Sequence, residues 1–314
     1  MKKITKFASV LMLAAAVVFA AGCTKPDEPN NGGNDNGGGN NGGGETPEVP
    51  TIPVGAVNGL FTINDDGDQV RFSQGNLQYQ ASTQKWQFAT NQYDYIGDAN
   101  SNISSSCSGW IDLFGWGTSG WDCGNTYYRP SDSDKGDGTL YGPPGEYNLT
   151  GSYANSDWGY YNTVSNGGSQ NHQWRTLTHE EWLYVFGRST SSGIRYALAK
   201  VNDVNGVILL PDNWSSSYYT LYDTNMSTRF SSNVISSTTW ANSLESHGAV
   251  FLPAAGARGG TSVGNVGSYG GYWSASYSNS YFAYSVGFKD GNFGMGTSYR
   301  YFGRSVRLVC PAEN

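Results

Sequence analysis

Beyond residue 55, hydrophobic and polar positions alternate in short runs, which is the pattern of β-strands with one buried face. Val70 and Phe72 form one such run, and Leu77 and Tyr79 form the next. Further short strands are predicted at 250–252, 282–288 and 305–309. Two turn signatures separate the runs: Asp65-Asp66-Gly67-Asp68, and Lys289-Asp290-Gly291-Asn292, which predicts a hairpin.

Two segments carry helical signals. Thr178 with Glu181 forms a capping box, and the helix that follows is expected to end at Gly187. A second helix is predicted from about 238 to 247, with Trp240 and Leu244 one turn apart and Gly248 after its end. Residues 91–168 show no helical period and predict loops and short strands. The chain is therefore predicted to be α+β, with two short helices, short antiparallel strands and extensive loops.

The first 55 residues follow neither pattern. Three lysines precede an apolar run at 7–21, which indicates a signal peptide over residues 1–22. The small residues before Cys23 resemble a bacterial lipobox, and this resemblance implies cleavage before Cys23 and acylation of its thiol. The alternative is an ordinary signal peptide with an incidental cysteine.

Residues 23–55 are predicted to form a lipidated flexible tether. Residues 30–44 are all Asn or Gly except Asp35, and such a segment cannot bury enough apolar surface to fold. A coil of this length reaches roughly 30 Å. The pair Asp27-Glu28 is similar to surface-export signals of some Gram-negative lipoproteins. We therefore expect an outer-membrane lipoprotein that faces the cell exterior.

Composition narrows the function. The 314 residues carry a formal net charge of −7, which argues against a nucleic-acid partner because such proteins need a basic face. Charged residues make up 14%, against roughly 25% in ordinary soluble domains. Gly, Ser, Asn and Tyr replace them, a mixture that resembles a recognition surface.

Metal and catalytic motifs are incomplete. His179-Glu180-Glu181 would need a second histidine at 183 for a zinc-protease helix, but Leu183 stands there. Asp132, Asp134 and Asp137 resemble a calcium loop with a spacing that is off by one, so calcium stays a minor alternative. We predict no metal, no cofactor and no catalytic residue.

Cysteines suggest one crosslink. Cys107 and Cys123 are a candidate disulfide in an exported protein, which would leave Cys310 unpaired. A nucleophilic cysteine needs a neighbouring base, and none is evident beside these three.

The most distinctive segment is 269–309, where seven of the 22 tyrosines fall between 269 and 301. Tyrosine offers a large contact area at low entropic cost, and Ser, Gly and Asn offer adaptable hydrogen bonds. The alternative is a β-rich surface with cross-strand aromatic pairs.

Four motifs resemble the formylglycine-generating-enzyme-like (sulfatase-modifying factor) branch of the C-type lectin fold. Trp174-Arg-Thr-Leu-Thr-His-Glu-Glu-Trp182 looks like the R-L-P-T-x-x-E-W helix start of that branch, with Thr176-Leu177 in place of Leu-Pro. The other three are 250–258, 271–274 and 303–309. More closely, the chain resembles the lipoprotein variable proteins of diversity-generating retroelements. In that family a reverse transcriptase rewrites adenines in a C-terminal repeat, and a lectin-fold scaffold displays the changed residues.

This resemblance implies a single C-type lectin-like ligand-binding domain over 56–314, with a variable-type segment at 269–304. Rewritten AAC or AAT codons cannot give Trp, Lys or Met, so Trp273, Lys289 and Met295 are not expected products. Trp273 is expected in the core, and alternation could turn Phe282 or Phe293 inward. The expected contacts with a protein or glycan ligand are Tyr277, Ser278, Asn279, Tyr281, Ser285, Asn292, Phe293, Thr297, Tyr299, Tyr301 and Phe302.

Two further expectations follow from the same resemblance. The strand with Val70 and Phe72 should pair with the strand that holds Val306 and Leu308, because C-type lectin relatives bring such strands together. A fixed adhesin or glycan-binding lectin on the same scaffold remains an alternative. A formylglycine-generating oxidase is disfavoured because that activity uses cysteines in the C-terminal part, and 269–309 contains none.

The lipid anchor can be tested at one residue. Cys23→Ser should move the protein from the membrane fraction to the soluble fraction, because the acylated thiol is the proposed attachment. Fractionation and immunoblotting of the two proteins measure this. Retention of the variant in the membrane would contradict acylation at Cys23.

Overall fold

The computed structural model describes residues 52–122, 129–130, 142 and 144–312. These belong to one compact unit, which spans Val49–Asn314. The predicted signal peptide, Cys23 and the tether up to residue 51 lie outside the described residues, as do Cys123 and the aspartates of the calcium alternative. Among the described residues, no helix is long and apolar enough to cross a membrane.

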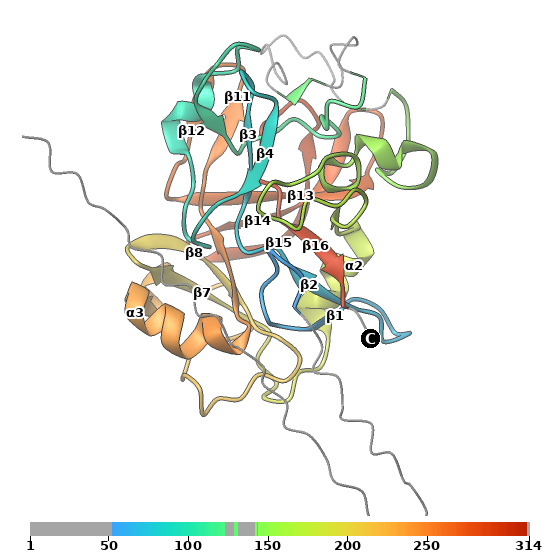
Figure 1. The fold of residues 1–314 in the computed structure, drawn as a ribbon. Helices are drawn as coiled ribbons and strands as arrows, with labels where there is room; N and C mark the ends of the chain where they lie inside the picture. Colours follow the sequence, from blue (N-terminus) through green and yellow to red (C-terminus); the bar gives the residue numbers. More distant parts are fainter. Residues whose placement is uncertain (1–51, 123–128, 131–141, 143, 313–314) are drawn as a thin grey trace, which may run out of the picture. The chain divides into compact units, whose positions relative to one another are not determined.

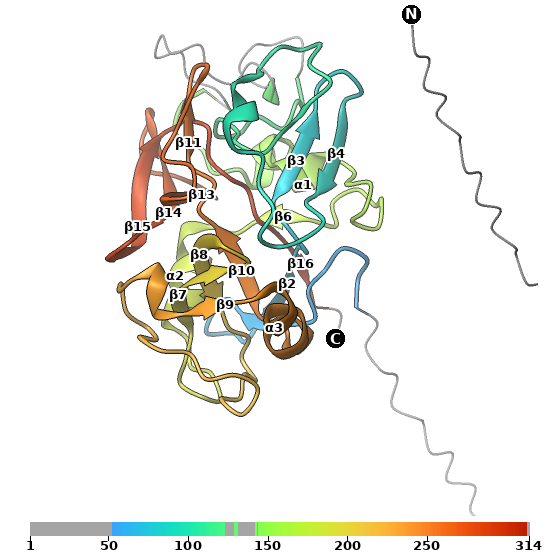
Figure 2. The ribbon, with the colours of Figure 1, turned by 90° about the vertical axis from the view of Figure 1, so that its left-hand side faces the viewer.

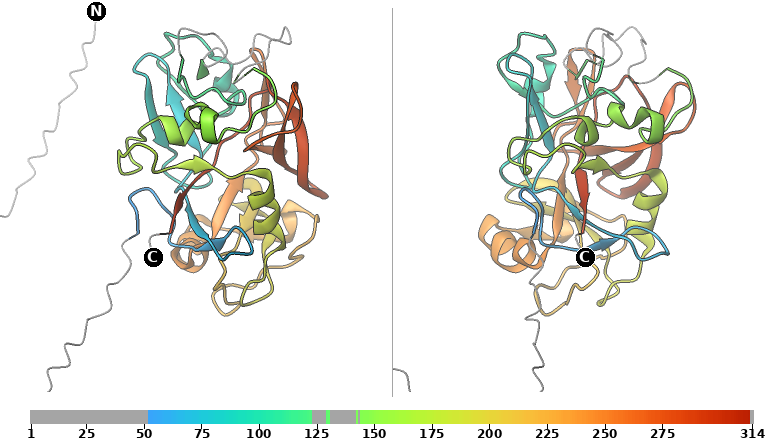
Figure 3. Two further views of the ribbon diagram at one scale, coloured as in Figure 1. Left: turned by 90° about the vertical axis from the view of Figure 1, so that its right-hand side faces the viewer. Right: turned by 45° about the vertical axis from the view of Figure 1, so that its right-hand side comes forward.

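The two ends of the domain meet in one antiparallel sheet, as predicted (Figures 1 and 3). Val309 lies opposite Phe72, and Pro311 lies opposite Val70. The last strand starts at residue 308 rather than 305, because residues 304 and 305 bridge to other parts of the chain instead. The sheet has the order β1-β2-β16-β6, with bounds β1 Phe61–Thr62, β2 Gln69–Phe72, β6 Arg175–Thr176 and β16 Leu308–Pro311.

A second four-stranded sheet was largely missed by the sequence pattern. Its centre is a hairpin whose turn residues, Asn202 and Asp203, both have positive φ (47° and 63°). This is the geometry of a two-residue primed turn. The order is β10-β8-β7-β9, with bounds β7 Tyr196–Val201, β8 Val204–Leu209, β9 Val234–Ile235 and β10 Val250–Pro253.

Three smaller sheets complete the strands. The predicted hairpin at Asp290-Gly291 is present between β14 and β15. The orders are β13-β14-β15, β4-β3-β5 and β11-β12. Their bounds are β3 Leu77–Gln80, β4 Lys85–Phe88, β5 Trp110–Ile111, β11 Ala257–Gly259, β12 Ser262–Gly264, β13 Tyr269–Tyr277, β14 Phe282–Lys289 and β15 Asn292–Tyr299.

Both predicted helices form. α2 (His179–Gly187) begins with the complete capping box of Thr178 and Glu181. The second starts as α3 (Ser237–Thr239), continues as a π-turn (Trp240–Leu244) and a 3₁₀ turn (Glu245–His247), and ends at Gly248 with φ +85°. The short α1 (Trp158–Tyr161), capped by Asp157, lies in the segment predicted as loop. Further 3₁₀ turns are Gly97–Ser101, Gly151–Ser156 and Phe230–Ser232.

Hydrophobic side chains gather in three clusters. The first joins β1 and β2 to α2 and to one face of β13–β14, with Trp182, Tyr272 and Phe288 among its members. The second contains five tryptophans, of which Trp273 is one, and also Val306 and Leu308. The third packs Trp240 and Leu244 of the second helix against β7, β8 and β10. The closing segment 303–311 contributes to the first two clusters and so joins them.

Two buried arginines, one of them in the closing segment, connect segments that are far apart in the chain. Arg307 is fully buried, and its guanidinium donates to the carbonyl oxygens of Ser73 (3.0 Å), Phe251 (2.6 Å) and Gln92 (3.4 Å). Arg258 is also fully buried and donates to the carbonyl of Leu113 (2.9 Å). Because carbonyl dipoles replace water around these cations, each contact holds a loop at a fixed position.

Loss of the Arg307 guanidinium should destabilise the domain. Arg307→Met keeps most of the volume but leaves three carbonyls without their buried donor, so we expect a loss of about 3 kcal/mol in the free energy of unfolding. Urea denaturation followed by tryptophan fluorescence measures it. The control is Arg229→Met at an exposed position, which should stay within about 0.5 kcal/mol. Equal stability of the two variants would contradict this role.

Candidate functional site

The β13–β14–β15 sheet is the platform for the predicted ligand contacts. The outer edge of β13 is covered, because Trp273 N–H donates to Ser305 O (3.0 Å) and Ala275 N–H donates to Leu177 O (2.8 Å). β14 pairs with β15 from Phe282–Tyr299 to Lys289–Asn292. β15 is the outermost strand (Figure 2). One edge of the platform is therefore fixed to the domain, and the other edge pairs with no further strand of the described residues.

One face of this sheet packs on the domain. Tyr272, Val286 and Phe288 belong to the first hydrophobic cluster. Phe293 packs against the same cluster, with its ring centroid 4.2 Å from Tyr196 and 4.8 Å from Phe186. Alternation has thus turned Phe293 inward, and its main contacts are with the core rather than with solvent.

The opposite face of the sheet is buried near Trp273 and becomes exposed toward the hairpin tip. Trp273 is fully buried, and its indole N–H donates to Phe114 O (2.7 Å), so the expectation that it belongs to the core is confirmed. Ser285, an expected ligand contact, is only 4% exposed, because it lies directly opposite Trp273. It is therefore not a displayed residue. Toward the hairpin tip this face carries glycines, and a Cβ placed on Gly294 or Gly296 would meet no atom within 4 Å.

A cavity of about 750 Å³ lies over this glycine-rich part. Four expected contacts line it: Ser285, Asn292, Phe293 and Thr297. Sequence reasoning missed the other polar contributors, because Asn265 and Ser268 precede the Tyr-rich segment and Lys289 was assigned to a turn. The complete lining is Asn265, Ser268, Tyr269, Ser285, Gly287, Lys289, Asp290, Asn292, Phe293, Gly294, Met295, Gly296 and Thr297.

A second group of expected contacts forms an aromatic cluster, which we define as Phe282, Tyr299, Tyr301 and Phe302. The ring of Tyr299 lies 4.2 Å from Phe282, 5.0 Å from Tyr301 and 5.9 Å from Phe302. Tyr299 is 39% exposed, and the adjacent Tyr281 is 59% exposed. These rings form an apolar surface with hydroxyl groups at its rim, which suits contact with another molecule.

In the turn between β13 and β14, some polar groups form hydrogen bonds within the turn itself. Asn279 Oδ1 accepts the N–H groups of Tyr281 (2.9 Å) and Phe282 (3.0 Å). Tyr277 packs against the second hydrophobic cluster and is half-buried, as is Ser278. The predicted residues thus divide between the cavity, the aromatic cluster and this turn.

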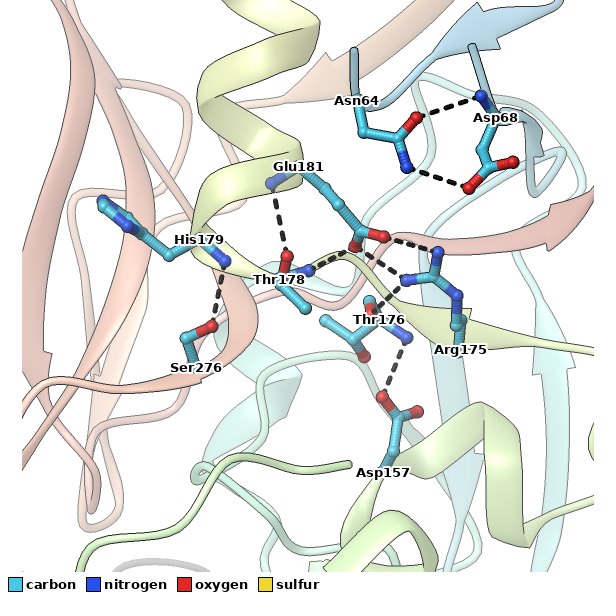
Figure 4. Close-up of polar contacts among 9 residues, drawn as sticks. All are labelled: Asn64, Asp68, Asp157, Arg175, Thr176, Thr178, His179, Glu181 and Ser276. Carbon is cyan, nitrogen blue, oxygen red and sulfur yellow. Dashed lines mark hydrogen bonds and ion pairs between the residues drawn. The ribbon is translucent and has the colours of Figure 1, made fainter. Parts of the chain in front are cut away.

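The start of α2 lies beside the platform and contacts it (Figure 4). Arg175 donates two hydrogen bonds of 2.7 Å to the Glu181 carboxylate, which also accepts Thr178 N–H (2.8 Å). His179 N–H donates to Ser276 Oγ on β13 (3.0 Å), and its ring stacks on Tyr284 of β14 at 3.9 Å. The motif at 174–182 is therefore a structural joint between α2 and the sheet.

Asp157 completes this joint. Its carboxylate is fully buried and accepts the N–H groups of Thr176 (2.8 Å) and Gly159 (2.9 Å). Burial raises the pKa of Asp157, and these hydrogen bonds oppose the shift. The carboxylate thus connects β6 to α1 and does not face the cavity.

The C-terminal part of the chain is basic, although the whole chain is acidic. Residues 249–312 contain five Lys or Arg residues and one acid, Asp290. Asp290 accepts the Phe230 N–H (2.9 Å). Arg304 donates to Ser298 Oγ (3.2 and 3.0 Å) and lies 4.9 Å from the centre of the Tyr269 ring. Burial lowers the pKa of Arg304, and the nearby Tyr269 opposes the shift.

Metal-binding and redox groups are scarce in the part of the chain that is described. There, no three His, Cys, Asp or Glu side chains gather as a metal site would require. Cys107 is a free thiol and Cys310 is buried. Cys123, the other half of the candidate disulfide, lies outside the described residues.

Comparison with known proteins gives one partial match. A family model described as "Domain of unknown function (DUF8237)" matches residues 225–309. This stretch contains β10 to β15 and most of the closing segment, and therefore the whole cavity lining and the aromatic cluster. No curated protein matches the chain, and no solved structure does.

The joint in Figure 4 should make stability pH-dependent. Burial raises the pKa of Glu181, but the bonds and charge of Arg175 outweigh this and hold it below its ordinary 4.5. This stabilisation is therefore present above pH 4.5 and is lost as the pH falls through the lower folded value. We expect Arg175→Met to cost about 2 kcal/mol at pH 7 and less at pH 3, measured by urea denaturation. A pH-independent cost would contradict the ion pair.

Proposed function

We propose that the protein is a surface-displayed lipoprotein that binds a protein or glycan ligand through the aromatic cluster, Tyr281 and the cavity over Gly294 and Gly296. We further propose a C-type lectin-like scaffold whose segment 269–304 is diversified by a retroelement. The observation that carries the proposal is the separation of the two sides of the platform. The ladder and the covered edge of β13 fix the backbone, while Tyr281 and Tyr299 project into solvent.

Several positions agree with the codon restrictions, although Lys289, which adenine rewriting cannot produce, is exposed. Trp273, which adenine rewriting cannot produce, is buried, whereas the compatible residues Asn279, Tyr281, Asn292, Thr297 and Tyr299 are exposed. Ser285 and Ser298 are compatible but buried, so changes there would act on the scaffold. We therefore expect sequence diversity mainly at the compatible residues that are exposed.

A genomic observation separates the proposal from a fixed adhesin or lectin on the same scaffold. A diversified protein requires a reverse-transcriptase gene and a near-copy of the codons for 269–309 nearby, with differences at template adenines. Absence of both would leave ligand binding in place but remove diversification.

Binding and folding should respond to different residues of the platform. Tyr281→Ala removes an exposed anchor, so it should reduce binding while stability stays within about 0.5 kcal/mol. Trp273→Ala empties a core site and should cost roughly 3–5 kcal/mol of stability. Thermal unfolding, with binding to glycan arrays and intact cells, measures both.

The matched control is Tyr161→Ala on α1, where a tyrosine is 38% exposed outside the platform, and it should change neither property. If Tyr281→Ala unfolds the domain while Trp273→Ala folds normally, the display face and the core face are assigned the wrong way round.

A further inference from the structure

The outer edge of β15 carries backbone groups that have no hydrogen-bond partner among the described residues. In an antiparallel ladder, residues alternate between those that bond to the neighbouring strand and those that point away from it. Arg300 N–H bonds to Tyr281 O, so residues 298, 296, 294 and 292 bond to β14, while 293, 295, 297 and 299 point outward. Phe293 O accepts Ser227 Oγ from outside the sheet, which agrees with this assignment.

The two ends and the middle of this edge differ in their hydrogen bonding. Phe293 O is met by Ser227, and Tyr299 O accepts Phe302 N–H. Within the described residues, the outward N–H and C=O groups of Met295 and Thr297 make no further hydrogen bond. A row of unpaired donors and acceptors is a template for another strand.

The edge also lacks the features that usually block strand addition. Those features are charged side chains, proline, bulges or a covering segment. β15 is eight residues long, contains no charged residue and no proline, and pairs with β14 without a register shift. By contrast, the other edge of the sheet is covered along β13.

The cavity extends along this same edge. Six consecutive β15 residues, 292–297, line it. A cavity on one face of a strand would be lined by alternate residues, because successive side chains point to opposite faces. Main-chain atoms of β15 therefore contribute to the lining beside Gly294 and Gly296, and the cavity extends from this edge across β14 to Tyr269 on β13. Over the two glycines there is room for side chains of an added strand.

We propose that the ligand is a protein, and that an extended segment of it binds as an additional strand along β15. This rests on the proposed ligand-binding function and narrows it to a peptide partner. Main-chain hydrogen bonds to Met295 and Thr297 supply affinity, and alternate side chains of the segment enter the cavity.

The positive charge of Lys289 favours a bound segment that contains an acidic residue. Lys289 lines the cavity near the hairpin tip, and its exposed side chain makes no hydrogen bond or ion pair within the described residues. The neighbouring acid, Asp290, already accepts Phe230 N–H. A segment with a carboxylate at the end nearest Lys289 is therefore preferred.

The experiment tests the backbone rather than a side chain. A phage library of linear random dodecapeptides is selected on the full-length protein in detergent, and enriched peptides are synthesised as probes. Thr297→Pro removes the outward N–H while β14 pairing is kept, and an edge strand tolerates proline. Thr297→Val keeps the N–H and measures the side-chain contribution alone. We expect the proline variant to weaken binding about tenfold or more beyond the valine variant.

Independent measurements keep the result interpretable. In hydrogen-exchange mass spectrometry of the unaltered protein, bound peptide should slow exchange in fragments that contain residues 293–299, and this holds even if Thr297→Pro fails to fold. Lys289→Glu should weaken peptides that carry an acid and leave their amide analogues unaffected.

Several outcomes would overturn the proposal: no linear peptide is enriched, the valine and proline variants bind equally, or exchange along β15 is unchanged. Sedimentation that shows β15-dependent dimers would assign the edge to a second copy instead. Tyr281→Ala and Tyr299→Ala are measured with the same probes. If they lose binding and Thr297→Pro does not, ligand binding stands and strand addition is wrong.

Discussion

The fold depends on a buried cation that forms no ion pair with a carboxylate of the described residues. Arg307 is surrounded by the carbonyls of Ser73, Gln92 and Phe251, which come from the end of β2, a long loop and β10. Burial lowers its pKa to about 10, so the guanidinium is still charged near neutral pH. Because an incompletely solvated buried charge is costly, the three carbonyls must all be in place. The last strand can therefore close only on a domain that is otherwise assembled.

This constraint explains how the platform tolerates exposed aromatic side chains. The hairpin of β14 and β15 comes before Arg307 in the chain, and β13 is joined to the closing segment at Ser305 and to the α2 joint at Ser276. The backbone of the hairpin is thus held by residues outside it. Side chains on a rigid ladder lose little entropy when a partner binds, which favours affinity. The exposed aromatic cluster therefore has little effect on the rest of the fold.

Local signals in the sequence predicted local structure well. The capping box at Thr178 and Glu181, the turn at Asp290-Gly291 and the end of the second helix at Gly248 each depend on a few neighbouring residues. The β7–β8 hairpin was missed although Asn202-Asp203 is a turn signal, because its apolar flanks read equally well as buried helix. The burial of Ser285 and the cavity could not be predicted, since both depend on which strands become neighbours.

The two parts of the candidate site differ in what a sequence change can alter. The aromatic cluster is made of side chains, so substitution at Tyr299 or Phe302 changes its shape and chemistry. The edge of β15 is made of main-chain groups, which any residue except proline at an outward position provides equally. A surface that joins the two keeps one constant means of attachment while its side chains vary. A substitution that changes specificity on such a surface does not abolish binding, because the main-chain hydrogen bonds still contribute affinity.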